Sequence, residues 1–150
     1  RGSRPPAPRD TRYQWAYLFG AACPARGATA ALVMPRADTH GMSAHLAEIA
    51  RTVAPEAHAV VVLDGAGWHA AKALVVPENL TLVPLPPYAP ELNPIETVRA
   101  YLRANRLAIS TMDTRDDILT RCCEAWNFFA GDPDRVRSIT NREYAKAVRR

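Results

Sequence analysis

Two carboxylates stand where an α/β protein tends to place reactive groups. Asp64 directly follows the apolar run 59–63. Glu96 is the third residue after Asn93, which with Pro94 signals the start of a helix. In open α/β sheets, binding and catalytic groups collect at the carboxyl ends of strands. With 31 residues between them, the two acids can meet at one edge of a sheet. A carboxylate cluster there would hold a hard cation such as Mg²⁺ or Mn²⁺.

Each acid also has a purely structural interpretation. Asp64-Gly65 is a strong turn dipeptide. Asn93 is a good helix N-cap, Pro94 suits the first helical position, and Glu96 would complete a capping box. The metal-site hypothesis therefore depends on the two acids together, since either one alone is better explained by local structure.

Three arginines follow Glu96 at helical spacing, namely Arg99, Arg103 and Arg106. Steps of three, four and three residues place them on one helix face together with Glu96. Guanidinium groups in line behind a carboxylate predict a track for a phosphate backbone. The alternative is a solvated face with i,i+3 ion pairs, each worth only about 0.2–0.5 kcal/mol.

The distribution of charge is compatible with a polyanionic partner. The net charge is +4, and arginine supplies 17 of the 19 basic residues. Residues 1–12 carry +3 and residues 135–150 carry +5, which leaves −4 for residues 13–134. Basic ends around an acidic body are common in proteins that bind nucleic acid. A GC-rich genome gives the same arginine- and alanine-rich composition, so charge alone leaves both interpretations open.

Apolar periodicity predicts the elements that position these residues. Strands are expected at residues 13–23, 28–34, 59–63 and 80–85, the first two as a hairpin. The run 59–63 is continuous and β-branched, which predicts a central strand buried on both faces. Helices are expected at residues 41–54, around 69–75, from Pro94 onward and at 114–129. This order predicts an α/β fold with a mixed sheet flanked by helices.

Length and composition exclude several classes of protein. A chain of 150 residues, 48% hydrophobic and 23% charged, fits one globular domain and neither a disordered nor a collagen-like chain. Its apolar runs are far too short to span a bilayer. The three cysteines, Cys23, Cys122 and Cys123, are odd in number and contain no CxxC pair, so they predict reduced, buried thiols rather than disulfides or a zinc site.

Two segments resemble catalytic blocks of a known enzyme family. They are VLDGAGWH at residues 62–69 and LPPYAPELNPIE at residues 85–96. They are similar to the second and third catalytic blocks of DDE transposases, with the bacterial insertion-sequence branch of the mariner-like superfamily as the nearest match. The second segment is long and specific, and the resemblance extends over residues 2–144.

The resemblance implies a ribonuclease-H-like fold in which Asp64 and Glu96 are two of three metal-binding carboxylates. Enzymes of this kind use two divalent ions, Mg²⁺ or Mn²⁺: one activates water or a DNA 3′-hydroxyl, and the other stabilises the leaving oxygen. His69 matches a family position near the Asp64 carboxylate, where packing or hydrogen bonding to a ligand is expected rather than metal binding. Asn93 is likewise expected to pack or hydrogen-bond beside Glu96 without binding the metal itself.

The sequence departs from the family pattern in three respects. No acid fits the first catalytic position, because Asp10 lies in the proline-rich arm and Asp38 in the turn after the second strand. The first strand of the sheet and its Asp are therefore expected upstream of Arg1. Arg99 stands where the branch usually has Trp, and the helix-turn-helix DNA-binding region is absent. The expected organisation is a basic, proline-rich arm at 1–12, a partial DDE catalytic domain at 13–134 and a basic tail at 135–150.

The function implied by the resemblance is that of a transposase catalytic domain, a DDE endonuclease performing Mg²⁺-dependent DNA cleavage and strand transfer in transposition. Its partners would be transposon ends and target DNA, in the bacterial cytoplasm at the nucleoid, with a homodimer as one assembly and no membrane. With two carboxylates instead of three, this chain alone is expected to be nearly inactive. The alternative is a non-catalytic transposase remnant that binds DNA or dimerises, and a third hypothesis is a decaying fragment of marginal stability.

Overall fold

The computed structural model describes residues 15–67, 71–107 and 114–142. In chain order the elements are β1 (Tyr17–Cys23), β2 (Ala28–Met34), α1 (Thr39–Thr52), β3 (Ala59–Leu63), β4 (Leu80–Pro84), the 3₁₀ turn η2 (Pro90–Leu92), α2 (Pro94–Asn105), α3 (Arg115–Ala130) and α4 (Pro133–Thr140). No helix among the described residues is long and apolar enough to cross a membrane.

The first two strands form an antiparallel hairpin. The pairing runs from Tyr17 opposite Met34 to Cys23 opposite Ala28. The connecting turn requires glycine, because Gly27 has a φ of 67° and donates its N–H to the Cys23 carbonyl at 2.8 Å. This hairpin was predicted from the two apolar runs and is confirmed.

The other two strands form a separate, parallel pair. Ala59 lies opposite Leu80, and Leu63 opposite Pro84. The Leu85 N–H continues the pairing with a bond of 2.7 Å to the Leu63 carbonyl. The predicted α/β class is confirmed. The described strands form two small sheets, one antiparallel pair and one parallel pair, and four α-helices flank them. The arrangement is compatible with a ribonuclease-H-like fold.

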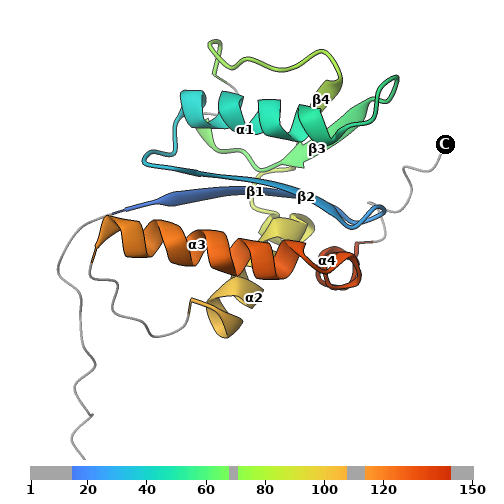
Figure 1. Ribbon diagram of the computed structural model, residues 1–150. Coiled ribbons are helices and arrows are strands. Elements are labelled where there is room, and N and C mark those ends of the chain that lie inside the picture. Colours follow the sequence, from blue (N-terminus) through green and yellow to red (C-terminus); the bar gives the residue numbers. More distant parts are fainter. Residues whose placement is uncertain (1–14, 68–70, 108–113, 143–150) are drawn as a thin grey trace, which may run out of the picture.

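The β1–β2 sheet lies between two helical layers, with α1 on one side and α3 and α4 on the other (Figure 1). Alternation along β1 sends Phe19 and Ala21 towards the α1 side and Leu18 and Ala22 towards the other. The α1 side has a buried cluster of Met42, Leu46, Ile49, Leu63 and Leu80. The α3 side has a second cluster of Val98, Leu102, Ala125, Trp126, Phe129 and Val136.

Helix α3 approaches the hairpin very closely because β1 has a glycine at the point of contact. A Cβ placed on Gly20 would come within 2.6 Å of two ring carbons of Trp126. The Trp126 ring in turn packs edge-on against Phe129, with their centroids 5.3 Å apart. Gly20 thus provides the room that this aromatic pair occupies.

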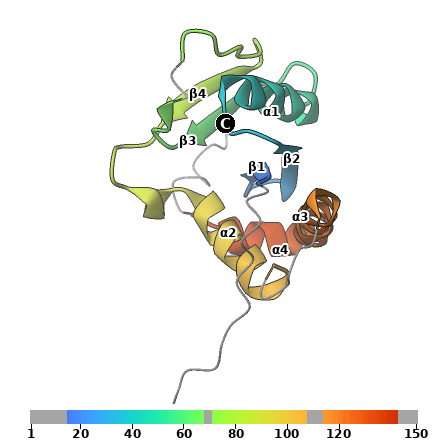
Figure 2. The same cartoon turned by 90° about the vertical axis from the view of Figure 1, so that its left-hand side faces the viewer.

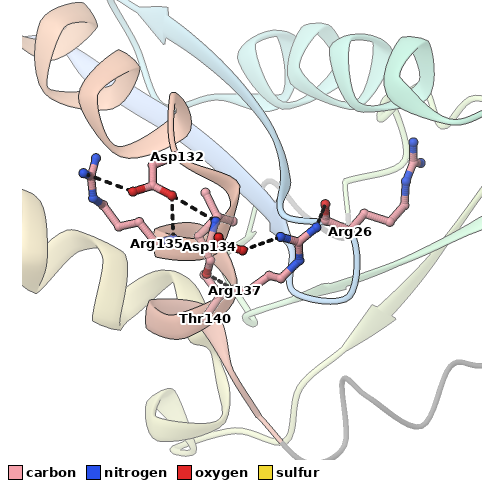
Figure 3. A network of polar contacts seen from close by, with 7 residues as sticks. Arg26, Asp132, Asp134, Arg135, Arg137 and Thr140 are labelled. Carbon is pink, nitrogen blue, oxygen red and sulfur yellow. Dashed lines mark hydrogen bonds and ion pairs between the residues drawn. The ribbon is translucent and has the colours of Figure 1, made fainter.

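Helix α4 binds the hairpin turn through a polar network (Figure 3). Asp132 caps the helix by accepting the backbone N–H groups of residues 134 and 135. Arg137 pairs with Asp134 at 2.8 Å and donates to the Arg26 carbonyl at 3.0 Å. Apolar periodicity does not predict α4, because Val136 is the only apolar side chain fully buried along its eight residues.

Helices α1 and α3 agree with the sequence predictions to within about two residues at both ends, and α2 begins at Pro94 as predicted. Val98 and Leu102 of α2 and Trp126 and Phe129 of α3 are buried as the spacing predicts. Of the three cysteines, Cys23 and Cys123 are exposed and Cys122 is half-buried, so the expectation of buried thiols is wrong for two of them.

The prediction that strand 59–63 is buried on both faces is wrong. Helix α1 covers the face that carries Val61 and Leu63. No described element covers the opposite face, where Val60 of β3 is 49% exposed and Val83 of β4 is 42% exposed. No described strand pairs with the second edge of β3 either.

The helix expected around residues 69–75 is wrong over its described part, 71–75, which forms a turn followed by an irregular segment. The Val75 N–H donates to the hydroxyl of Ser43 in α1 at 3.1 Å, in place of a helical bond. The first residues of that prediction, 68–70, lie outside the described residues.

Candidate active site

Asp64 lies one residue beyond the end of β3, at the carboxyl end of the parallel pair. Its carboxylate is exposed, and its Oδ1 accepts the Ala66 N–H at 3.3 Å, a long bond typical of a loose turn. A Cβ added at Gly65 or Gly67 would meet no atom within 4 Å. Gly65 and Gly67 therefore have room for a small side chain beside them.

Glu96 lies in the first turn of α2, but it does not cap that helix. Asn93 is the N-cap, and its Oδ1 accepts the Ile95 N–H at 3.1 Å. A capping box would also need Glu96 to accept the Asn93 N–H, yet that N–H donates to the Pro90 carbonyl at 2.9 Å. The N-cap prediction is confirmed and the capping-box alternative for Glu96 is wrong.

Helix α3 of the same chain begins with a complete capping box, with which the start of α2 can be compared. Thr114 accepts the Asp117 N–H at 3.1 Å, and the Asp117 carboxylate accepts the Thr114 N–H at 2.9 Å. This is a complete capping box with an acid at the third helical position. Glu96 occupies the same position in α2 and instead pairs with Arg99 at 2.9 Å on the surface. Its carboxylate therefore has no role in satisfying the α2 backbone.

The segment between β4 and α2 connects the surroundings of the two acids. It begins beside β3, since the Leu85 N–H bonds the carbonyl of Leu63, the residue before Asp64. It then runs along the outer edge of the molecule, on the left of Figure 2, through η2 to the start of α2. Asp64 and Glu96 thus flank the two ends of one proline-rich segment.

The described residues do not complete a metal centre by themselves. No group of three or more His, Cys, Asp or Glu side chains within ranges 15–67, 71–107 and 114–142 could hold a metal ion. Asp38, an acid considered from the sequence, caps α1 by accepting the Gly41 N–H at 2.8 Å. Asp10 and His69 lie outside the described residues. The chain therefore offers two candidate carboxylates, Asp64 and Glu96.

The three arginines predicted to share one face do not remain in line. Arg99 and Arg103 are exposed on α2. Arg106 lies beyond the last residue of the helix, with its guanidinium carbon 3.5 Å from the centroid of the Phe128 ring. Arg135 of α4 packs on the same ring at 4.0 Å. Arg106 thus contributes to the contact between α2, α3 and α4.

One basic residue near Glu96 comes from a region that the sequence analysis did not connect with the site. Arg142 donates to the hydroxyl of Thr97, the neighbour of Glu96, at 2.7 Å. These residues are 45 positions apart, and no sequence spacing indicates their contact. The structure thus adds the Arg142 guanidinium to that of Arg99 near the first turn of α2, while Arg103 lies in its last turn.

Comparisons with known proteins show the family to which the chain is similar. A family model described as DDE superfamily endonuclease matches residues 1–119. The chain is 51% identical over 131 residues to the uncharacterized protein y4pE/y4sA of Sinorhizobium fredii, an alignment that covers 87% of this chain and 97% of that protein. No solved structure matches the chain significantly.

Proposed function

Because this chain belongs to the DDE superfamily endonucleases, we propose that it is a transposase catalytic domain for DNA cleavage and strand transfer in transposition. The observation that carries the proposal is the state of Glu96. It stands where a carboxylate ordinarily caps a helix, yet the backbone group it would cap is bonded to Pro90. Together with Asp64, directly after the end of β3, it supplies the two carboxylates on which the proposal depends.

In this proposal Asp64 and Glu96 bind the divalent metal ions, Mg²⁺ or Mn²⁺, two in the intact enzyme. Asn93 fixes the start of α2 from a buried position and so orients Glu96. His69 would lie near the Asp64 side. Arg99 and Arg103 would contact the phosphates of transposon ends or target DNA, with Arg106 at the end of the same helix. The reaction would take place in the bacterial cytoplasm at the nucleoid, and a homodimer is one assembly that would present both DNA ends.

The two carboxylates do not fit a two-ion site without a further ligand, because like-charged ions need a bridging acid between them. We propose that the first catalytic Asp is carried by a strand that is not among the described residues. Two free edges support this idea: β1 and β3 each pair on one side only among the described strands. In Figure 2 β1 is the strand of its sheet nearer to β3. A strand between them would join both pairs into one mixed sheet.

A plasmid-nicking assay tests the proposal of an incomplete catalytic site. The purified 150-residue chain is expected to show almost no nicking with Mg²⁺ or Mn²⁺. Metal-dependent nicking that disappears in Asp64→Ala would contradict the need for a further acid.

The second candidate function is a non-catalytic DNA-binding or dimerising remnant. The Glu96–Arg99 ion pair favours it, since a carboxylate already paired with a guanidinium is a weaker metal ligand. DNA binding that falls with salt, and that is indifferent to Mg²⁺ and to Glu96→Gln, would support this candidate. Binding strengthened by Mg²⁺ in the wild type, but not in Glu96→Gln, would support the catalytic proposal.

A further inference from the structure

Tyr88 is the most exposed of the large hydrophobic side chains that the structure describes, with its full surface in water. Its backbone is left-handed, with a φ of 61°. That region is uncommon for residues other than glycine and costs about 1–3 kcal/mol for a bulky side chain. An exposed aromatic ring on a strained backbone serves no purpose in the packing of this fold, which points to a contact outside the chain.

The surrounding prolines hold Tyr88 in place. Pro86, Pro87 and Pro90 each fix their own φ near −65°, and Pro90 also restricts Ala89 before it. The next turn is closed by the Leu92 N–H on the Ala89 carbonyl at 3.1 Å. The ring is thus presented by a stiff backbone, so binding through it would cost little further loss of backbone freedom.

Tyr88 lies on the segment that joins β4 to α2, between the two candidate catalytic acids in the sequence. The Leu85 N–H is bonded to the carbonyl of Leu63, directly before Asp64. Three residues of extended chain span at most about 10 Å, so the Tyr88 backbone is within that distance of Leu85. In the other direction the segment passes through η2 to the helix that carries Glu96. A strand of DNA held by the two acids would therefore pass close to the ring.

An exposed tyrosine ring recognises the flat face of another ring. In duplex DNA the base faces are covered by stacking, so a side chain reaches them only where a base is unpaired or extruded. Stacking between an aromatic side chain and such a base is tolerant of sequence and changes affinity by about 1–3 kcal/mol per base. The nucleotides at a cleavage site offer this face when the strands separate locally.

We propose that Tyr88, on its proline-stiffened turn between Asp64 and Glu96, stacks on an unpaired base of the DNA strand bound at these acids. The site would accordingly select DNA with a locally separated strand over fully paired duplex. This inference rests on the proposed function, and it names the form of the substrate that the site takes.

Fluorescence anisotropy of the 150-residue chain in metal-free buffer tests the proposal without relying on catalysis. The probes are a labelled single strand of about 20 nucleotides, the same sequence as a duplex, and that duplex with one unpaired 2-aminopurine. Tyr88→Ala is expected to weaken binding to the single strand and to the unpaired-base duplex by about 5- to 100-fold, the range that corresponds to one stacked base. Binding to the fully paired duplex should change less than about twofold.

Two control variants separate stacking from apolar contact. Tyr88→Phe keeps the ring and is expected to bind as the wild type does, with the same quenching of 2-aminopurine fluorescence. Leu92→Ala removes apolar surface from the same segment and should leave all three affinities within about twofold. Thermal unfolding checks that each variant is folded. The Tyr88 variants are expected to unfold as the wild type does, because the Tyr88 side chain is fully exposed.

Three results would overturn the inference: equal binding by Tyr88→Ala and the wild type, an equal loss for all three DNAs, or no binding of any DNA by the wild type. Equal binding by Tyr88→Ala and the wild type would indicate that the ring contacts a protein partner instead of DNA. These results are distinct from failure of the proposed function, which is judged by metal binding at Asp64 and Glu96. Stacking without metal binding would place Tyr88 in a DNA-binding remnant.

Discussion

The two sheets of this molecule differ in how completely they are covered. The β1–β2 hairpin packs on both faces, against α1 on one side and α3 and α4 on the other. The β3–β4 pair is covered on the face towards α1, and Val60 and Val83 face water on its other side. Asp64 follows β3 of the half-covered pair, and the segment after β4 leads to Glu96 on α2, a helix that packs with the covered sheet. The two candidate acids therefore lie where the half-covered sheet connects to the well-packed part of the molecule.

The largest effect is expected in the core of the covered sheet. Phe129 is fully buried and packs edge-on against Trp126. Phe129→Ala should lower the free energy of unfolding by about 3–5 kcal/mol, because it removes a large buried ring and leaves a cavity. Val60→Ala on the half-covered sheet should cost less than about 1 kcal/mol. Urea unfolding followed by circular dichroism measures the free energy of unfolding of both variants. Equal losses would contradict the difference in packing between the two sheets.

Two glycines give the next comparison. Gly20→Ala would place a methyl group 2.6 Å from the Trp126 ring and should destabilise the protein by about 1–3 kcal/mol. Gly65→Ala, beside Asp64, meets no atom within 4 Å and should leave the unfolding midpoint nearly unchanged. A large loss of stability in Gly65→Ala would mean that the surroundings of Asp64 are packed rather than open.

The two helix starts allow a finer test of what the acids do. Thr114→Ala breaks the capping box of α3, and Asn93→Ala removes the cap of α2. Each should cost about 1 kcal/mol. Glu96→Gln breaks only an exposed ion pair with Arg99 and should cost no more than about 0.5 kcal/mol. If Glu96→Gln costs as much as Thr114→Ala in urea unfolding, Glu96 is a structural residue.

The smallest effect concerns thiol reactivity in the covered region. Burial, and to a lesser extent the neighbouring Cys123, raises the pKa of the Cys122 thiol. At mildly alkaline pH, Cys122 should therefore be alkylated more slowly than the exposed Cys23 and Cys123, because the thiolate is the reactive form. The raised pKa also means that this thiol favours folding at low pH and that its contribution is lost as pH rises through the folded pKa. Mass spectrometry of peptides after timed iodoacetamide treatment gives the alkylation rate of each cysteine. Equal rates would show that burial does not slow the reaction of Cys122.

The same contrast explains what could be predicted from the sequence. The helices that contain Leu46, Leu102 and Trp126 repeat their apolar residues at helical spacing, so their existence and inner faces could be predicted. Strand 59–63 could be located, but a continuous apolar run does not tell whether one or both faces are covered. Helix α4 has too few apolar residues to be found by periodicity, although Asp132-Pro133 is a recognisable helix start.

The local structure around the two candidate acids could be predicted, but their contacts could not. The end of a strand and the start of a helix indicated Asp64 and Glu96. Whether Glu96 caps its helix or pairs with Arg99 depends on where the Asn93 N–H bonds, and that depends on the path of the preceding turn. The place of Arg106 could not be read from its spacing, since α2 ends one residue earlier.

The proposed function requires that Asp64 and Glu96 together bind a divalent metal ion. Titration of the ¹⁵N-labelled chain with Mn²⁺, followed by paramagnetic broadening of its amide NMR signals, tests it directly. We expect selective broadening around residues 64–67 and 93–97 that is lost in Asp64→Asn and weakened in Glu96→Gln. Broadening centred on other acids such as Asp116, or unchanged by both substitutions, would contradict the account.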